Sequence, residues 1–161
     1  MNTLVASVGY TNLSDLSFGP YLMSRLKQLA WPEGVTLEDL SFGPIAVMQQ
    51  LEDSAGRFDR AVFIAGVPRG RKAGSLDIYR WNPAPFDEEE IRERINESVT
   101  GVISLDNLLT VCHFFHVLPP EVICIEAEPV TTDFGLTCSA AVSSLMDLVI
   151  DIVQRDAAGI P

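Results

Sequence analysis

The sequence has few cysteines, few basic residues and no long apolar run, and each shortage argues against a class of protein. Its three cysteines, at positions 112, 124 and 138, are an odd number without a CxxC pair, so we expect no disulfide framework. Eleven basic residues against 22 acidic ones give a net charge of −11, which disfavours nucleic acid as a partner. No apolar run reaches the roughly 18 residues of a membrane span. The first ten residues lack the basic start of a signal peptide, so we expect a cytoplasmic protein that does not bind membranes.

Common catalytic motifs are also missing. The chain contains no GxSxG sequence and no phosphate-binding P-loop sequence, so hydrolases with a serine nucleophile and nucleotide hydrolases are disfavoured. The cysteines lie in apolar stretches without an identifiable base, and we interpret them as inert core residues.

Short apolar runs alternate with amphipathic stretches over 161 residues, of which 47% are hydrophobic. This alternation predicts one α/β domain over residues 1–161, built as a three-layer α/β/α sandwich around a mostly parallel sheet of about five strands. The expected strands are 3–8, 34–39, 60–66, 75–81 (an edge strand) and 122–128. The expected helices are 20–30, one starting at residue 44, 87–97, 104–116 and 138–154.

One sequence occurs twice with a single difference, as LSDLSFGP at 13–20 and LEDLSFGP at 37–44. Both copies follow an expected strand and precede an expected helix, so we interpret them as one structural device used twice. Ser17 and Ser41 are expected to cap the helices. Asp15 and Asp39 are expected at the carboxyl edge of the sheet, where ligands bind in such folds. The alternative is that both aspartates only hydrogen-bond their turns.

The order of motifs from residue 4 to residue 153 resembles the hydrogenase maturation proteases. The matching segments are SVGYTNLSDLSFGP, LEDLSFGP, VFIAGVPRGRKAGSLDIYRW, LDNLLTVCHFFHVLPPEVICIEAEP and FGLTCSAAV. The resemblance implies a phosphorylase/hydrolase-like α/β fold. It also implies a protein partner, because these endopeptidases trim the C-terminus of the large subunit of nickel–iron hydrogenases.

The same resemblance implies that the family's metal site is lost. Its three ligand positions, two acidic residues and a histidine, correspond here to Leu16, Gly66 and Gly101, whose side chains cannot bind a metal. We therefore expect no metal cofactor. If the backbone has kept its shape, restoring the ligands as Leu16→Glu, Gly66→Asp and Gly101→His is expected to create a site.

Nickel or another divalent cation is expected only if the ligands have moved. Asp15, Asp39 and Glu126 are cleft candidates that would suit a hard cation or a basic peptide. His113 and His116 are spaced for a shared metal, although the end of a helix also explains them. The basic stretch RGRKAG at 69–74 could hold an anion, or could be the family's mobile loop.

Three functions follow. The first is a maturation-protease-like protein that binds a hydrogenase large subunit or a related partner without the usual metal-dependent cleavage. The second is an active endopeptidase with an altered or substrate-supplied metal. The third is a binding module for a small ligand or cation.

Overall fold

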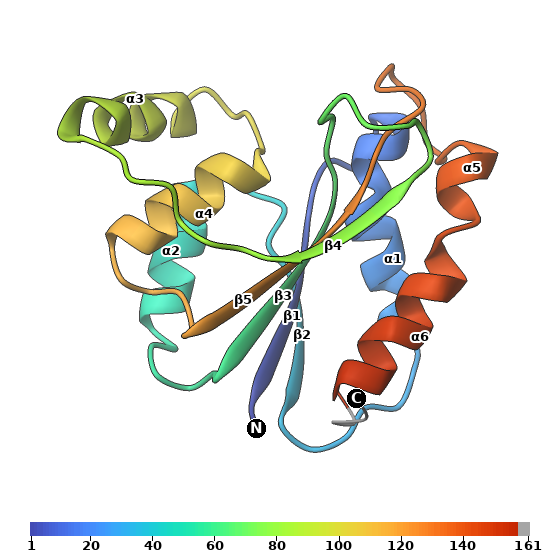
Figure 1. Ribbon diagram of the computed structural model, residues 1–161, viewed down its shortest axis with the longest axis horizontal. Helices are drawn as coiled ribbons and strands as arrows, with labels where there is room; N and C mark the ends of the chain where they lie inside the picture. The colour runs from blue at the N-terminus through green and yellow to red at the C-terminus, as the bar shows by residue number, and fades with distance from the viewer. Residues whose placement is uncertain (158–161) are drawn as a thin grey trace.

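The computed structural model describes residues 1–157 and contains a five-stranded sheet (Figure 1). The strands are β1 (Thr3–Val8), β2 (Val35–Asp39), β3 (Arg60–Gly66), β4 (Leu76–Arg80) and β5 (Glu121–Ala127). Their order across the sheet is β2-β1-β3-β5-β4. All neighbouring pairs are parallel except β4 with β5, so β4 is an antiparallel edge strand. The prediction of a mostly parallel five-stranded sheet is confirmed.

Helices cover both faces of this sheet, which makes three layers (Figure 1). The helices are α1 (Phe18–Leu26), α2 (Pro44–Glu52), α3 (Glu88–Ser98), α4 (Leu105–Phe114), α5 (Ala140–Ser143) and α6 (Met146–Ala157). Helices α1, α5 and α6 lie on one side, and α2 and α4 on the other, with α3 packed beyond α4. Among residues 1–157, none of these helices is long and apolar enough to cross a membrane.

The alternation of side chains along the central strands explains the two apolar layers. Leu4, Ala6 and Val8 of β1 pack into the cluster under α2 and α4, whereas Val5 packs into the cluster under α1 and α6. Successive side chains of a strand point to opposite faces, so a strand that is apolar at every position must be covered on both sides. All six residues of β1 are buried, as this arrangement requires.

The main difference from the expected elements is at the end of the chain. The single helix expected over 138–154 is two helices, α5 and α6, separated by a turn at residues 144–145. Ser139 caps α5, because its hydroxyl oxygen accepts a hydrogen bond from the backbone N–H of Val142. Ser139, Ser143 and Ser144 all make such local side-chain hydrogen bonds, which compete with a continuous helix.

The two copies of the repeated sequence adopt different structures. The first copy forms a 3₁₀ turn (Ser14–Ser17) that five residues separate from β1, and Pro20 is the third residue of α1. The second copy begins inside β2, and Pro44 is the first residue of α2. The interpretation as one device used twice is therefore wrong. Near-identical octapeptides take different local structures because the surrounding strands hold them differently.

The expected capping roles of the two serines are also wrong. The Ser17 hydroxyl oxygen accepts a hydrogen bond from the backbone N–H of Leu13, and the Ser41 hydroxyl donates to Asp39. Neither α1 nor α2 has a side-chain cap at its first residue.

Candidate functional site

A cleft of about 260 Å³ lies at the carboxyl edge of the parallel strands. It is bounded by the end of β1, the turn before α1, the end of β3 and the start of α4. The residues that matter most for its chemistry are Tyr10, Leu16, Gly66, Ile103, Ser104 and Asp106. The phenol oxygen of Tyr10 accepts a hydrogen bond of 2.9 Å from the backbone N–H of Ile103, which joins the two sides of the cleft. A cleft at this edge is the usual ligand position in an open α/β sheet.

Glycines let the turn before α1 press directly on the ends of β1 and β3. A Cβ atom at Gly66 would lie 2.1 Å from the carbonyl oxygen of Asp15, and one at Gly19 would lie 2.4 Å from that of Ile64. A Cβ atom at Gly9 would lie 2.4 Å from the carbonyl oxygen of Leu16. Because the opposing atoms are backbone, no side-chain rotation can make room. The backbone therefore occupies the space that a side chain at Gly66 would need.

These contacts affect the three positions that the sequence resemblance assigns to metal ligands. Leu16 and Gly66 line the cleft without a ligating atom, and Gly101 lies outside its lining with a φ of +81°. Within residues 1–157, no group of three or more His, Cys, Asp or Glu side chains is placed to hold a metal ion. The residues present do not fit the family's metal.

Asp15 is fully buried and faces a loop rather than the cleft. Its carboxylate accepts hydrogen bonds from the backbone N–H groups of Val130, Thr131 and Ser139, at 2.7–3.2 Å, and from the Ser139 hydroxyl at 2.9 Å. Asp15 thus fastens residues 129–139 to the start of α1. Asp15 is therefore a structural carboxylate, but it holds a distant loop and not its own turn as the alternative expected.

Asp39 ends β2 at the same edge of the sheet but is likewise outside the cleft lining. One of its oxygens accepts hydrogen bonds from the Ser7 hydroxyl and from the N–H and hydroxyl of Ser41. Asp15 bonds to a distant loop, whereas Asp39 bonds to Ser41 in its own turn and to Ser7 on the neighbouring strand β1. They do not converge on a shared ligand position among the described residues.

Glu126, on β5, is the centre of a buried ion-pair network. Arg69 donates two hydrogen bonds to it, at 2.7 and 3.1 Å, Arg71 donates one at 2.9 Å, and the Tyr79 hydroxyl donates one at 2.7 Å. Burial alone would raise the pKa of Glu126, but the hydrogen bonds from Arg69 and Tyr79 outweigh it, and the pKa lies below its usual value. The side chain is fully buried, so it offers no free carboxylate to a cation or a basic peptide.

Arg69 connects this network to the cleft. Besides Glu126, its guanidinium donates two hydrogen bonds to Asp106 in the first turn of α4, at 2.6 and 2.7 Å. The hydrogen bonds to Glu126 and Asp106 raise the pKa of Arg69 further above its already high value. Asp106 is the acidic residue of the cleft lining, and its charge is compensated by this two-bond pair.

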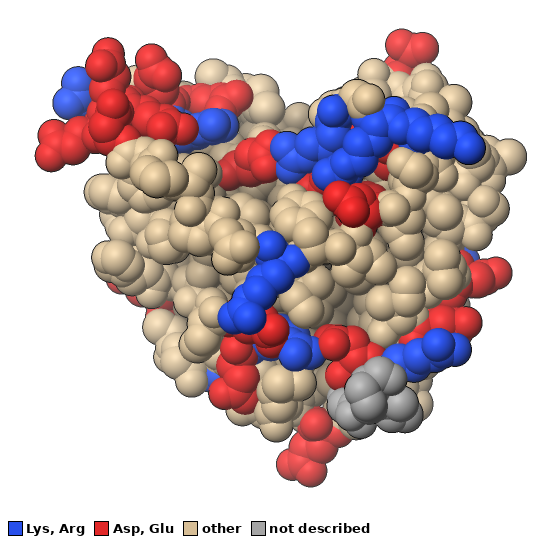
Figure 2. All heavy atoms as spheres, viewed as in Figure 1, with Lys and Arg blue, Asp and Glu red and all other residues tan. Residues whose placement is uncertain are grey.

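The basic loop at 69–74 is therefore held by the protein's own carboxylates. Glu128 accepts hydrogen bonds from the backbone N–H groups of Arg69 and Gly70, and Arg71 also pairs with Asp77 at 3.0 Å. These contacts argue against both hypotheses for residues 69–74, that the stretch binds an anion and that it is a mobile loop. Figure 2 shows the basic side chains gathered on one side of the notch at the top of the molecule, with the acidic residues of α3 on the other.

The remaining candidates do not add chemistry to the cleft. His113 and His116 lie at the far end of α4, with ring centroids 6.5 Å apart. Burial raises the pKa of the Cys112 and Cys124 thiols to about 12 and that of Cys138 to about 11, which makes all three poor nucleophiles.

Sequence reasoning missed Arg69 and Asp106 as residues of the site. Arg69 contacts Asp106, which is 37 positions away along the chain, and Glu126, which is 57 positions away. A local sequence pattern does not indicate contacts at such separations. The available signal was the position of Asp106 in the first turn of a helix that starts at the carboxyl edge of the sheet.

Comparison with solved structures matches this arrangement over nearly the full chain. A hydrogenase 2 maturation peptidase from Thaumarchaeota archaeon SCGC_AB-539-E09 is 24% identical, with a TM-score of 0.67 and 100% of both chains covered. The hydrogenase maturating endopeptidase HybD from E. coli is 21% identical, with a TM-score of 0.71, covering 99% of this chain and 93% of HybD. The chain has the fold of the hydrogenase maturation proteases.

The maturation-protease fold also recurs in a more distant structure. The [NiFe] hydrogenase maturation protease HycI from Thermococcus kodakarensis KOD1 is 13% identical, with a TM-score of 0.64, covering 98% of this chain and 92% of HycI. No family model matches the sequence, and a search of curated proteins found no match. The maturation-protease fold is thus shared with solved structures that are 13–24% identical to this chain.

Proposed function

We propose that this protein acts in hydrogenase maturation by binding a nickel–iron hydrogenase large subunit or a related precursor, without metal-dependent cleavage. The main support is the cleft that contains two of the positions assigned to metal ligands by the sequence resemblance. Leu16 and Gly66 line it, and the backbone carbonyl of Asp15 occupies the space where a side chain at position 66 would begin. At position 66, the shape of the backbone as well as the identity of the side chain therefore argues against a metal ligand.

The electrostatics of the cleft support the same proposal. A metal site of carboxylates needs uncompensated negative charge directed at one point. Here Asp106 is paired with Arg69, which is itself held by the buried Glu126. Binding a cation at Asp106 would require this pair to separate, at a cost of about 1 kcal/mol, because the Asp106 side chain is 44% exposed.

A protein-binding role is supported by the loop that Asp15 fastens beside the turn before α1. This loop exposes three apolar side chains, with exposed fractions of 52% for Val130, 75% for Phe134 and 68% for Leu136. Apolar side chains that are held in place and exposed together are typical of interaction surfaces. Because Asp15 makes four hydrogen bonds to this loop, little ordering would remain to oppose binding.

The test is incubation with a nickel-loaded large-subunit precursor. We expect the two proteins to elute together in size-exclusion chromatography, and we expect intact mass spectrometry to show a precursor of unchanged mass. Loss of a C-terminal peptide would instead establish the active endopeptidase. Failure to elute together, combined with tight binding of a divalent cation in calorimetry, would favour the small-ligand or cation module.

The docking surface can be tested with a matched pair of variants. Phe134→Asp should weaken complex formation by at least about tenfold, since a central apolar contact is worth about 1–3 kcal/mol. Leu148→Asp is the control, because Leu148 lies on α6 with a comparable exposed fraction of 51%. Equal effects of the two substitutions would contradict the assignment of this loop as the docking surface.

A further inference from the structure

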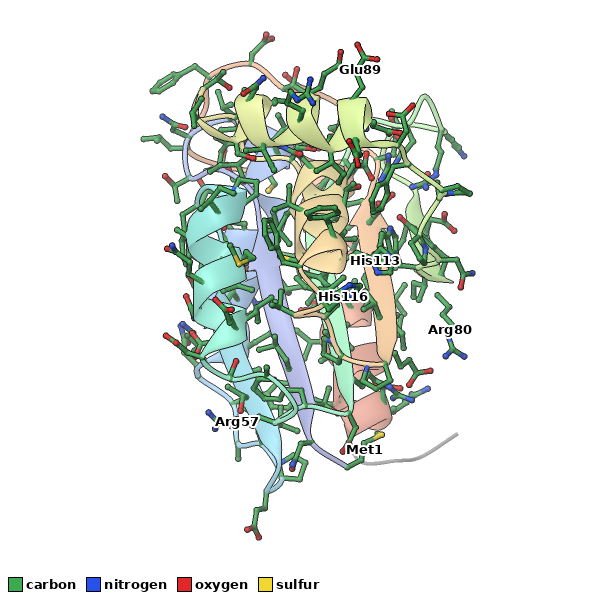
Figure 3. All side chains as sticks on the ribbon, turned by 90° about the vertical axis from the view of Figure 1, so that its left-hand side faces the viewer. Met1, Arg57, Arg80, Glu89, His113 and His116 are labelled. Atoms are coloured by element: carbon green, nitrogen blue, oxygen red, sulfur yellow. The ribbon has the colours of Figure 1, made fainter. Side chains whose placement is uncertain are left out.

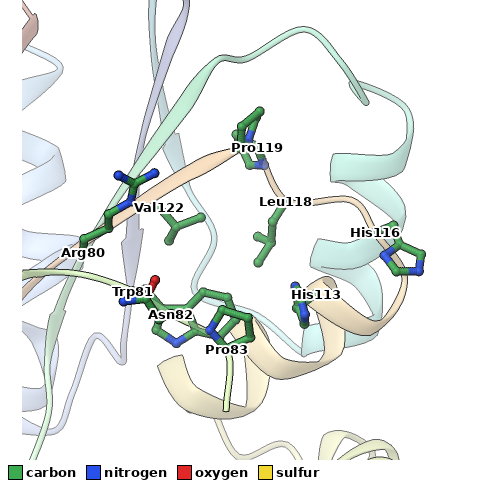
Figure 4. Close-up of a pocket in the computed structure, with 10 residues that line it drawn as sticks. Arg80, Trp81, Asn82, Pro83, His113, His116, Leu118, Pro119 and Val122 are labelled. Carbon is green, nitrogen blue, oxygen red and sulfur yellow. The ribbon is translucent and has the colours of Figure 1, made fainter. Parts of the chain in front are cut away.

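A second cavity, of about 350 Å³, lies at the opposite end of the strands from the cleft (Figure 4). Its walls come from the segment that follows β4, the end of α4 and the segment that enters β5. Helix α4 connects the two sites, since Asp106 in its first turn lines the cleft and His113 in its last turn lines this cavity. At about 1.5 Å per residue, the seven residue steps from Asp106 to His113 correspond to about 10 Å along the helix axis.

The charge of this cavity differs from that of the protein as a whole. Arg80, Asn82, His113 and His116 contribute nitrogen-bearing side chains, and the ten described residues that line the cavity include no Asp or Glu. Arg80 is also poorly paired, with a side chain that is 65% exposed and 4.0 Å from Glu121. In a chain of net charge −11, a cavity lined by hydrogen-bond donors without carboxylates favours an anion.

The apolar part of the cavity combines one flat aromatic ring, Trp81, with three prolines and the aliphatic side chains of Leu118 and Val122. The Trp81 and His113 rings meet edge to face with centroids 5.6 Å apart, and Phe86 contacts His113 from another side at 6.0 Å. These two contacts hold the His113 imidazole between two aromatic rings. In Figure 4, the Trp81 indole and His113 lie on one side of the cavity, and Pro119 and the Arg80 guanidinium lie on the other. The indole face of Trp81, on the side opposite Pro119, favours a planar ligand.

The backbone at His116 is an independent indication. His116 has a φ of +57°, the left-handed conformation that glycine usually provides after a helix. The backbone N–H groups of His116 and Val117 donate to the carbonyls of His113 and Cys112, which completes the end of α4. A histidine there costs stability that a glycine would not, and strain of this kind is often kept at functional positions. Figure 3 shows both imidazoles near the end of α4, away from Glu89 on α3.

We infer that this cavity binds a small aromatic carboxylate. The carboxylate group lies against the Arg80 guanidinium, the ring packs between Trp81 and the proline side, and His116 donates at the rim. This site is separate from the proposed function, because it uses neither the cleft nor the loop that carries Phe134. Either a free aromatic acid or the C-terminal carboxylate of an aromatic residue supplies this chemistry.

Two-dimensional ¹H–¹⁵N NMR of the whole chain tests the inference, because the protein has only two tryptophans. Benzoate should shift the indole N–H signal of Trp81 in a saturable way. The Trp31 indole should not respond, because it donates to the Leu26 carbonyl oxygen at 2.8 Å and packs with the α1 and α6 cluster. The variant Trp31→Phe assigns the two signals. For a ligand of this size we expect a dissociation constant of about 1 mM.

Uncharged and substituted probes separate the possible outcomes. Benzamide should bind at least about tenfold more weakly than benzoate, as expected when a charged hydrogen bond is lost. N-acetylphenylalanine represents a peptide terminus, and tighter binding of it than of benzoate would identify that source. The inference would be overturned if neither benzoate nor N-acetylphenylalanine saturated the protein at about 20 mM, or if benzamide bound as tightly as benzoate.

Two variants distinguish a site from a merely exposed cavity. Arg80→Gln should weaken benzoate binding at least about tenfold, whereas Arg92→Gln, at an exposed position on α3, should leave it unchanged. His116→Gly should raise the urea midpoint of unfolding while it weakens benzoate binding. Unchanged benzoate binding in both Arg80→Gln and His116→Gly would overturn the assignment of these residues.

Discussion

Rebuilding the family's metal ligands should fail, because the backbone has closed over one of their positions. In Gly66→Asp, the new Cβ atom would begin 2.1 Å from the carbonyl oxygen of Asp15, whereas ordinary contact begins at 3.4 Å. The two backbone segments would have to separate by more than about 1 Å. This differs from the expectation drawn from the sequence, which held that Leu16→Glu, Gly66→Asp and Gly101→His together create a site.

The size of the effect follows from what must move. Overpacking of a rigid region costs about 1–3 kcal/mol, and a displacement of Asp15 also strains hydrogen bonds to a charged group that are worth about 1.5–3 kcal/mol each. We therefore expect Gly66→Asp to lower the free energy of unfolding by at least about 3 kcal/mol. Gly101→His adds about 1–2 kcal/mol, because a non-glycine residue would have to adopt a φ of +81°.

Urea unfolding followed by circular dichroism measures these losses, and calorimetry measures nickel binding. Gly56→Asp is the matched control. It introduces the same side chain in a left-handed position with nothing within 4 Å of the new Cβ atom, and should cost less than about 2 kcal/mol. A triple variant that is as stable as the parent and binds nickel with micromolar affinity would refute the reasoning.

Three further predictions concern residues that hold the site together. Gly19→Ala should destabilise the protein by at least about 3 kcal/mol in urea unfolding, whereas Gly43→Ala, whose Cβ atom would meet nothing closer than 3.7 Å, should cost less than about 1 kcal/mol. Similar losses of stability in Gly19→Ala and Gly43→Ala would show that the two copies of the repeated sequence have the same structural role. Asp15→Asn should cost about 2–4 kcal/mol and speed amide hydrogen exchange in the fastened loop, because an amide nitrogen in place of either Asp15 oxygen would face a backbone donor. Asp39→Asn should have a much smaller effect on both stability and exchange. Glu126→Gln should cost about 3 kcal/mol at pH 7. Because the pKa of Glu126 is lowered on folding, its contribution to stability is present above the unfolded pKa of about 4.3 and is lost as the pH falls through the folded value. The urea midpoints of the parent protein and Glu126→Gln should therefore converge in acid. A constant difference between the two midpoints down to pH 3 would contradict this.

Much of the fold was predictable from local patterns. The buried run at residues 3–8, the β-branched run at 60–66 and the alternation at 75–81 each became a strand, because periodicity reports directly which faces of an element are covered. The edge position of 75–81 was also indicated by its more polar alternation, whereas its antiparallel direction came from the structure. The break between α5 and α6 was missed, because apolar spacing continues across it.

The site depended on contacts that local patterns do not contain. Sequence order indicated that Leu16 and Gly66 had replaced ligands, but only the tertiary structure showed the Asp15 carbonyl in the space above Gly66. Asp15 and Asp39 stand in nearly identical octapeptides, yet one fastens a loop more than 110 positions away and the other bonds to its neighbours.

Side-chain chemistry and strand periodicity are properties of short segments, so the sequence alone determined the elements of this protein and the absence of ligating atoms at Leu16 and Gly66. The pairing of Arg69 with Asp106 and Glu126 joins three distant segments, and it exists because the fold brings the ends of β3 and β5 and the start of α4 to one edge of the sheet. Only the tertiary structure could decide which carboxylates were already compensated, since compensation depends on distances in space between residues far apart in the chain.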